Sequence, residues 1–325
     1  MSTRRTILEL LGDGGFHSGT EIGARLGISR AAVNKAIARL NAQGLDIHSV
    51  GGKGYRWSEP SSLFQVSRLQ SMLASEITGH GLNIEIVDEV ESTTSQLITQ
   101  LPKKAISGSV CIAESQSGGR GRRGRSWHSS PYRNVAMSMA WQFDFGPAGA
   151  SGLSIAAGVA VLRALEQSGV SNIQLKWPND IIYENRKLAG LLVDLRGESA
   201  GPTMVVLGLG LNVYIDPQTA ENIDQPWIDL ATLLGQRPDR NELVAALIRE
   251  FVRLFTIFGE HGLPPFIEEW HRYHAFEDQP VRLVGASDEL QGVVCGLDSS
   301  GALMLRTASG EVVSAHSGEV SLRAN

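Results

Sequence analysis

The chain has 325 residues and a mass of 35.0 kDa, with 42% hydrophobic and 19% charged residues. This length exceeds what one hydrophobic core usually organises, so we expect two or three domains. The composition, with 36 Gly and 12 Pro, excludes a disordered, coiled-coil or collagen-like protein. The longest apolar run, 153–162, is too short to span a bilayer, and no signal-peptide pattern is present. We therefore expect a cytoplasmic protein that does not enter a membrane.

The two cysteines, Cys111 and Cys295, lie far apart in apolar, strand-like runs. Two cysteines alone do not form a metal cluster or a disulfide framework. We interpret both as small buried hydrophobic residues in a reducing cytosol.

The net charge of -5 is unevenly distributed along the chain. Residues 1–65 hold eight Lys and Arg against five acidic residues, a balance of +3 that leaves -8 for the remainder. A small basic head on an acidic body is typical of one module that binds a polyanion.

Three short amphipathic helices are predicted in this head. The apolar spacing indicates a helix over 4–11, a second that Thr20 caps and Gly27 ends, and a third over 30–43 that Ser29 caps. Two short helices joined by a tight turn form the helix-turn-helix arrangement. The third helix directs away from the core a set of polar side chains that suit bases and phosphates in a major groove: Ser29, Arg30, Asn34, Lys35 and Arg39.

A glycine-rich hairpin follows these helices. Strands over 45–50 and 55–57 flank a turn with Lys53 at its tip, which is the pattern of a basic wing. We therefore predict a winged helix-turn-helix DNA-binding domain over 1–65, which ends in the linker 59–62. The alternative is a three-helix packing module with a solvated charged face.

The middle of the chain alternates strands with helices. We expect strands near 83–88, 109–114, 134–143, 173–177, 181–183, 187–195 and 204–211. We expect helices over 67–74, 93–101, 148–167, 240–255 and 265–273. Because hairpins interrupt the alternation, we predict an α+β domain with a mixed sheet and helices mainly on one face.

Residues 278–323 form a separate module of short strands and turns. The strands are expected at 281–284, 290–297, 302–306, 311–314 and 320–322, and the turns at 286–288, 299–301 and 309–310. This pattern predicts a small β-barrel. The three predicted domains thus cover 1–65, 66–274 and 275–325.

An arginine-rich loop lies between two predicted strands of the middle domain. Residues 119–125 read Gly-Arg-Gly-Arg-Arg-Gly-Arg and formally match a dinucleotide-binding pattern, but the next residues, which include Pro131, cannot open the required helix. Glycines let the backbone approach a ligand, and guanidinium groups pair with carboxylate and phosphate oxygens. The loop is therefore a candidate anion site, with a solvated basic loop and an RNA patch as alternatives.

Three more motifs bring polar residues to strand ends. They are Lys176-Trp177-Pro178-Asn179-Asp180, Arg186-Lys187-Leu188-Ala189-Gly190 and Gly208-Leu209-Gly210-Leu211-Asn212. Taken singly, the first is also readable as a simple turn and the second as a lysine whose stem is buried and whose charge is solvated.

These four motifs and the winged helix occur in the order and spacing of a known family. From about Phe16 to Arg323, the chain resembles the bacterial bifunctional biotin–protein ligases and biotin operon repressors. The resemblance implies a class II synthetase-like ligase fold for the middle domain and an SH3-like barrel at the C-terminus. It further implies that biotin and ATP, with Mg²⁺, form biotinyl-5′-adenylate.

The resemblance also implies partners. Biotin is expected to pass to a lysine of the biotin carboxyl carrier protein of acetyl-CoA carboxylase. The adenylate is expected to act as a corepressor that promotes a homodimer on the operator DNA of biotin synthesis genes.

Individual residues take roles from the same resemblance. Biotin contacts are implied for Ser92, Thr93, Thr94, Gln116, Arg120, Gly121, Arg122, Lys187 and Gly190. Adenylate or ATP contacts are implied for Arg125, Trp127, Asn179, Asp180, Asn212 and Trp227. Catalytic roles are expected for Arg122, Lys187, Asp180 and Lys176. Mg²⁺ is expected to arrive with ATP, without a fixed protein site. For Ser92 and Thr93, capping of the following helix is the alternative.

One segment departs from the family pattern. In repressing members, a loop after the Asn212 strand closes over the adenine with several apolar residues. Here the stretch 214–227 is largely polar and interrupted by prolines, with Ile215, Ile223 and Trp227 as the apolar candidates. Dimerisation driven by the adenylate therefore rests on a weaker match than catalysis does.

Three other functions compete with this hypothesis. A lipoate–protein ligase shares the body fold and the core lysine, but the arginine loop and the winged head favour biotin. A non-catalytic biotin-sensing repressor has no need for Lys187, Asp180 and the arginine loop together. A ligase whose head has lost DNA binding is disfavoured by the presence of Arg30, Asn34 and Lys35.

Overall fold

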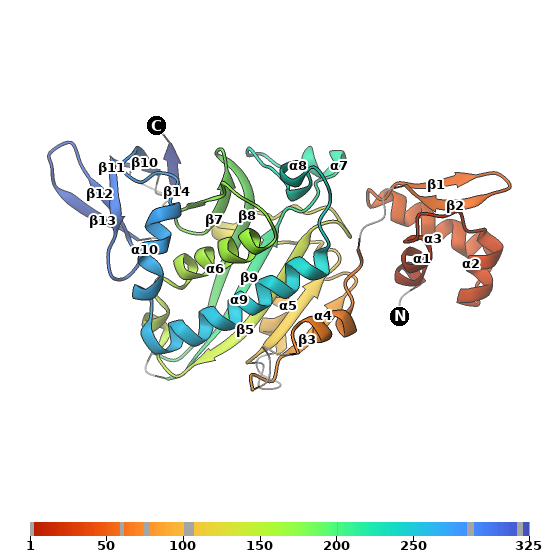
Figure 1. Ribbon diagram of the computed structural model, residues 1–325, viewed down its shortest axis with the longest axis horizontal. Coiled ribbons are helices and arrows are strands. Elements are labelled where there is room, and N and C mark those ends of the chain that lie inside the picture. Colours follow the sequence, from red (N-terminus) through yellow and green to blue (C-terminus); the bar gives the residue numbers. More distant parts are fainter. Residues whose placement is uncertain are drawn as a thin grey trace.

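The computed structural model describes residues 3–58, 62–74, 79–100, 107–199, 201–284, 289–316 and 321–324. Within them, a small helical head, a central sheet covered by helices and a C-terminal sheet follow one another along the chain (Figure 1). The linker residues 59–61 and the predicted turn 286–288 lie outside the described residues.

The head has the predicted winged helix-turn-helix order. It contains α1 (Thr3–Leu11), α2 (Gly19–Leu26), α3 (Arg30–Ala42), β1 (Ile47–Val50) and β2 (Gly54–Trp57). Ser29 caps α3 as predicted, because its side chain accepts a hydrogen bond from Ala32 N. The prediction that Thr20 caps α2 is wrong: Ser18 has the extended backbone of a cap, and its hydroxyl accepts from Glu21 N.

The hydrophobic core of the head includes one residue from the central domain. Tyr132 is 1% exposed and belongs to the same buried cluster as Ile7, Ile37 and Trp57. Nearby, Arg4 Nη1 lies 2.8 Å from Glu89 Oε2, which adds an ion pair between the two domains. The head is therefore docked on the body by apolar packing as well as by the chain connection.

A mixed seven-stranded sheet forms the central domain. Its strands are β3 (Asn83–Val87), β4 (Ser109–Ala113), β5 (Val135–Phe143), β6 (Gln174–Lys176), β7 (Asp180–Tyr183), β8 (Arg186–Gly197) and β9 (Thr203–Leu211). Their order is β3-β4-β5-β9-β8-β7-β6, with β3 parallel to β4 and the remaining neighbours antiparallel. The predicted mixed sheet is thus confirmed.

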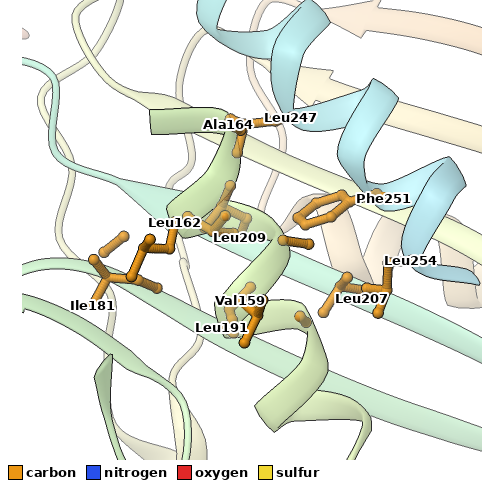
Figure 2. Packing of buried hydrophobic residues seen from close by; sticks show 14 of the residues in the cluster. Val159, Leu162, Ala164, Ile181, Leu191, Leu207, Leu209, Leu247, Phe251 and Leu254 are labelled. Carbon is orange, nitrogen blue, oxygen red and sulfur yellow. The ribbon is translucent and has the colours of Figure 1, made fainter. Parts of the chain in front are cut away.

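The helices lie mainly on one face of this sheet. The elements are α4 (Val66–Met72), α5 (Thr93–Gln100), α6 (Leu153–Gln167), α9 (Arg240–His261) and α10 (Pro264–Tyr273). Residues of α4, α6, α9 and α10 share one large core with alternate residues of β5 and β9, and Figure 2 shows α6 and α9 packed over Leu207 and Leu209. The residues between them, such as Ala140 and Val206, pack instead with Leu97 of α5. Since side chains alternate along a strand, α5 covers the opposite face.

The helix predicted over 148–167 is interrupted. A 3₁₀ turn, η2 (Pro147–Ala150), precedes α6, and Gly152 between them has a φ of +78°. A Cβ there would lie 2.6 Å from Leu263 Cδ2, so only glycine fits this break. The segment Pro147–Gln167 has the length and hydropathy of a membrane span, but most of it is buried inside the protein, as expected of a core helix.

Two short helices were not predicted. They are α7 (Pro217–Ala220) and α8 (Leu230–Leu234). Asp216 and Asp229 cap them, each accepting a hydrogen bond from a threonine amide of the first turn. Both helices are too short to show an apolar period, so periodicity along the sequence does not predict them.

The C-terminal domain is a five-stranded antiparallel sheet. It consists of β10 (Pro280–Val284), β11 (Glu289–Leu297), β12 (Leu303–Arg306), β13 (Val312–Ala315) and β14 (Ser321–Ala324), in the order β13-β12-β11-β10-β14. The strands lie close to the predicted ranges, and the closure into an SH3-like barrel stays a prediction.

The two cysteines differ in environment. Cys111 in β4 is fully buried, and burial raises the pKa of its thiol to about 12, so it is a chemically inert core residue as predicted. Cys295 in β11 is only half-buried, and its predicted burial is wrong.

The docking of the head generates a prediction about Tyr132. Replacing Tyr132 by Ala should lower the free energy of unfolding of the head by about 3 kcal/mol, because a buried aromatic ring leaves a cavity. Tyr132→Phe, which keeps the ring, is the matched control. Hydrogen exchange of amides in 3–57 measures the effect, and equal protection in the two variants would contradict it.

Candidate active site

One cavity of about 620 Å³ lies on the sheet face opposite the main helical layer. It is lined by every residue for which the resemblance implies a ligand contact or a catalytic role: Ser92, Thr93, Thr94, Gln116, Arg120, Gly121, Arg122, Arg125, Trp127, Lys176, Asn179, Asp180, Lys187, Gly190, Asn212 and Trp227. The structure thus brings together residues that are up to 135 positions apart in the chain. Their individual roles stay predictions.

Small residues form the floor of this cavity. A Cβ on Gly210 would lie 2.3 Å from the Trp127 indole, and one on Gly208 would lie 2.6 Å from Thr94 Oγ1. A Cβ on Gly190 would lie 3.2 Å from Trp127 Cζ3. The glycines of β8 and β9 therefore let the indole and the threonine lie directly on the sheet.

A buried hydroxyl network occupies one end of the cavity. Thr93 donates from its N to Gln116 Oε1 at 2.8 Å, and its Oγ1 lies 2.8 Å from Ser138 Oγ. Thr94 Oγ1 lies 2.9 Å from the same serine oxygen. Ser92 Oγ accepts a long hydrogen bond of 3.5 Å from Ser95 N. Ser92 is therefore at most a weak cap of α5, which was the alternative to a ligand contact. The network fixes polar groups in a dry site, where they suit a polar ring.

Sequence reasoning missed Ser138. It is fully buried in β5 and links the two threonines. A serine between Met137 and Met139 was the available signal, because a hydroxyl in an otherwise apolar strand needs partners.

Lys187 and Asp180 form an ion pair at the other end. Lys187 Nζ lies 2.7 Å from Asp180 Oδ1, and both side chains are about four-fifths buried. The ammonium also lies 5.5 Å from the centroid of the Trp127 ring. The backbone N–H of Lys187 donates to Pro226 O, which brings the segment of Trp227 beside β8. The lysine charge is thereby held at the cavity wall, and its β8 strand is fixed by neighbours on both sides.

The arginine loop is a compact hairpin that contacts Asn179, the residue before Asp180. It forms a single turn, η1 (Arg122–Gly124), closed by a 2.7 Å hydrogen bond from Gly121 N to Arg125 O. Arg122 Nη1 donates to Asn179 Oδ1 at 3.3 Å. Burial lowers the pKa of the Arg122 guanidinium, with Asp180 acting in the opposite direction. A cation that is partly stripped of water interacts strongly with an anionic ligand.

Asn212 is largely engaged within the protein. Its Nδ2 donates to Lys187 O at 3.2 Å and to Ile228 O at 3.1 Å. Only its Oδ1 is left to contact a ligand. Asn212 therefore holds the backbone of Lys187 and of Ile228 in place, and its contact with an adenylate stays a prediction.

In the loop after Asn212, one of the three apolar residues expected to cover the ligand does not line the cavity. Ile223 and Trp227 line the cavity, whereas Ile215 is buried away from it, with its N–H donated to Asp229 Oδ2 at 2.9 Å. The Asp229 carboxylate that caps α8 therefore also holds the backbone of Ile215.

The predicted DNA-contacting residues lie on the head, apart from the cavity. Arg30, Lys35, Arg39 and Lys53 are exposed, while Ser29 is used as the α3 cap. A further predicted residue, Asn34, donates to the wing residue Tyr55 at 3.2 Å. The sequence analysis missed two neighbours, Phe16 and Arg56. Exposed Phe16 lies 5.7 Å from Lys53 Nζ and 5.8 Å from Arg56 Cζ, so Arg56 is a second cation on the wing.

The cavity suits an anionic nucleotide. Six Lys and Arg side chains line it, namely Arg120, Arg122, Arg123, Arg125, Lys176 and Lys187. Trp127 Nε1 is a buried donor without a hydrogen-bond partner among the described residues. Across the described chain, no cluster of three His, Cys, Asp or Glu side chains suits a metal ion. The donor set fits carboxylate and phosphate oxygens better than a resident cation.

Comparisons with known proteins agree with this geometry. Residues 87–212 match the biotin/lipoate A/B protein ligase family, residues 3–56 an HTH domain, and residues 278–323 the biotin protein ligase C-terminal domain. The chain is 39% identical to the bifunctional ligase/repressor BirA of Salmonella typhimurium and 37% to that of Escherichia coli, covering 98% of this chain and 97% and 96% of those proteins.

A solved structure shares the fold of the body. The biotin protein ligase from Aquifex aeolicus, in complex with biotin and ATP, matches with a TM-score of 0.63 and 24% identity, over 75% of this chain and 99% of that one. The relatives of Salmonella and Escherichia cover the head as well, since almost the whole of each chain is aligned. The chain therefore belongs to the family of biotin–protein ligases that carry a DNA-binding head, the bifunctional ligase/repressors.

Proposed function

We propose that this protein joins biotin to ATP as biotinyl-5′-adenylate and transfers the biotin to a lysine of the biotin carboxyl carrier protein of acetyl-CoA carboxylase. The observation that carries this proposal is the convergence of the arginine loop, the Lys187–Asp180 pair and the hydroxyl network on one cavity. A polar ring fits the hydroxyl end, and a carboxylate and a phosphate fit the cationic end.

The first half-reaction brings two anions together. The biotin carboxylate attacks the α-phosphorus of ATP, the bond to the β-phosphate oxygen breaks, and pyrophosphate leaves. Lys187 and Arg122 lie where they would offset the negative charge that develops on the α-phosphate. Mg²⁺ bound with ATP would neutralise the pyrophosphate, and no protein residue is proposed to hold it permanently.

Trp127 has a distinct part in this proposal. Its indole lies on the glycines of β8 and β9 and beside the Lys187 ammonium, at 5.5 Å. A ring held in this way is a flat wall that excludes water from the reacting groups. Its N–H and the side chains of Ile223 and Trp227 are proposed to contact the adenylate.

The second half-reaction needs a free amine. A lysine side chain has a pKa near ~10.4 and is protonated at neutral pH. Asp180 is proposed to orient the acceptor amine or to accept its proton. The amine nitrogen then attacks the acyl carbon of the adenylate, the bond from that carbon to the phosphate oxygen breaks, and AMP leaves. Lys176, close by on β6, is proposed to support the charge of the departing phosphate.

The proposal is tested by ATP–pyrophosphate exchange with biotin and lipoate side by side. We expect exchange with biotin and none with lipoate. Lys187→Met, which keeps the length of the side chain, should reduce exchange by about 100-fold or more, because it removes a charge from the transition state. Exchange with lipoate alone would contradict the proposal that biotin is the substrate. No exchange with either acid would contradict the proposal that the protein catalyses adenylation.

A second prediction concerns Asp180. Asp180→Asn, supplied with preformed biotinyl-5′-adenylate, should transfer biotin to the carrier protein about 10- to 100-fold more slowly, since an amide cannot accept the proton. Single-turnover transfer of radiolabelled biotin measures the rate. Transfer at the normal rate would remove Asp180 from this step.

We propose in addition that the adenylate makes this protein a repressor of biotin synthesis genes, acting in the cytoplasm. Exposed cations on α3 and the wing supply phosphate contacts, and the wing is fixed to α3 by the Asn34–Tyr55 hydrogen bond. The adenylate is proposed to order the loop of Ile223 and Trp227 and so to favour a homodimer that binds the two halves of an operator.

Dimerisation is a further testable property. Biotin with ATP should shift the protein from monomer to dimer in sedimentation velocity at micromolar concentration, because a ligand that binds the dimer better shifts the equilibrium toward it. The control is biotin with an ATP analogue in which a methylene replaces the oxygen between the α- and β-phosphates, since pyrophosphate cannot leave and no adenylate forms. A monomer that persists with biotin and ATP would refute the role proposed for the loop of Ile223 and Trp227.

A further inference from the structure

The C-terminal domain touches the central domain beside the Lys176–Asp180 motif. The contact is made by the turn between β11 and β12, residues 298–302. The indole N–H of Trp177 donates to Gly301 O at 3.1 Å, and the Trp177 side chain is 1% exposed. A buried donor of this kind needs its partner, so the two groups fix each other's position.

The turn that carries this acceptor is held rigidly. The Asp298 carboxylate accepts from Ser300 N at 2.8 Å, Ser300 Oγ at 2.7 Å and Ala302 N at 3.0 Å. Gly301 has a φ of +83°, and a Cβ there would lie 2.9 Å from Gly152 Cα. The carbonyl of Gly301 is therefore presented from a well-determined position.

Two more contacts reach the residues just before Trp177. Ala275 N donates to Leu175 O at 2.9 Å, and Lys176 Nζ lies 6.0 Å from the Phe276 ring centroid. These residues belong to β6, which lies at the edge of the seven-stranded sheet and pairs there with β7. The C-terminal domain and the segment that enters it thus contact two residues of an edge strand and Trp177, the residue that follows them.

The other side of Trp177 leads into the catalytic groups. Two residues beyond it, Asn179 Oδ1 accepts from Arg122, and three residues beyond it Asp180 pairs with Lys187 at 2.7 Å. The position of both partners depends on where the chain leaves β6. A shift of about 1 Å at a reacting group costs on the order of 100-fold in rate.

We infer that the C-terminal domain is a positioning element for adenylation, acting through the Trp177–Gly301 hydrogen bond on Asn179 and Asp180. The inference rests on the proposed function. It gives the domain a kinetic role in the first half-reaction without any contact between its sheet and the substrates. Trp177 and Gly301 are positioning residues in this scheme.

The test compares variants on the two sides of the contact with a matched control. Trp177→Phe removes the donor and keeps a ring, while Asp298→Ala releases the turn that presents the acceptor and lies outside the cavity lining. Ser151→Ala is the control, because Ser151 Oγ donates to Ser300 O at 2.7 Å and so joins the same two domains away from the motif. Pyrophosphate exchange gives kcat and the KM for biotin, and thermal unfolding gives stability.

Both test variants should lower kcat by roughly 10-fold or more, with the KM for biotin changed by less than about 2-fold, since the hydroxyl network is not attached to this turn. Ser151→Ala should lower the melting temperature as they do, with kcat within about 2-fold of the original. That split is not expected of a merely structural contact.

Three outcomes overturn the inference. They are an unchanged kcat in both test variants, an equal loss in Ser151→Ala, and a loss in Trp177→Phe alone, which would mean that the indole itself contacts the ligand. If Asp298→Ala does not fold, Gly301→Ala, which displaces the same carbonyl, replaces it. Absence of exchange in the original protein contradicts the proposed function instead, so the two failures are distinguishable.

Discussion

The two faces of the central sheet impose opposite demands on the same strands. On β5 and β9, alternate residues are large and apolar and pack against α6 and α9, as Leu207 and Leu209 do (Figure 2). Next to the cavity the residues between them are small, and Gly208 and Gly210 leave the space that Thr94 and Trp127 occupy. A shift of register by one residue would exchange these faces and remove both the core and the cavity.

A buried ion pair connects this sheet to the rest of the molecule. Glu114, directly after β4, pairs with Arg240 at 2.7 Å, and both side chains are at most 1% exposed. Glu114 also accepts from Phe64 N, while Arg240 donates to Ser62 O and Asn134 O. Because every charge has partners, the cost of burying the pair is offset. The segment that leaves the head is thereby fixed to the strand that leads into the ligand loops.

Contacts between domains fall close to the ligand-binding segments. Tyr132, in the core of the head, follows the arginine loop, and Ser130 Oγ accepts from Asp216 N, at the start of the segment that carries Ile223 and Trp227. At the opposite end of the body, Gly301 holds the chain next to Asp180. The head and the C-terminal domain therefore both contact the central domain within a few residues of the cavity lining.

The sequence alone predicted the winged head and the mixed sheet, because both follow from short-range periodicity. Many of the cavity residues were predicted from the resemblance to a known family, which rests on motifs such as the arginine loop. The sequence placed the α2 cap at Thr20 and ran one helix through Gly152, since local patterns do not reveal which serine is extended or which backbone lies against Leu263. Only the tertiary structure decided that Ser138 joins the threonines, that Tyr132 packs into the head and that Trp177 meets Gly301. These contacts join residues 44 or more positions apart, and no local pattern encodes such pairs.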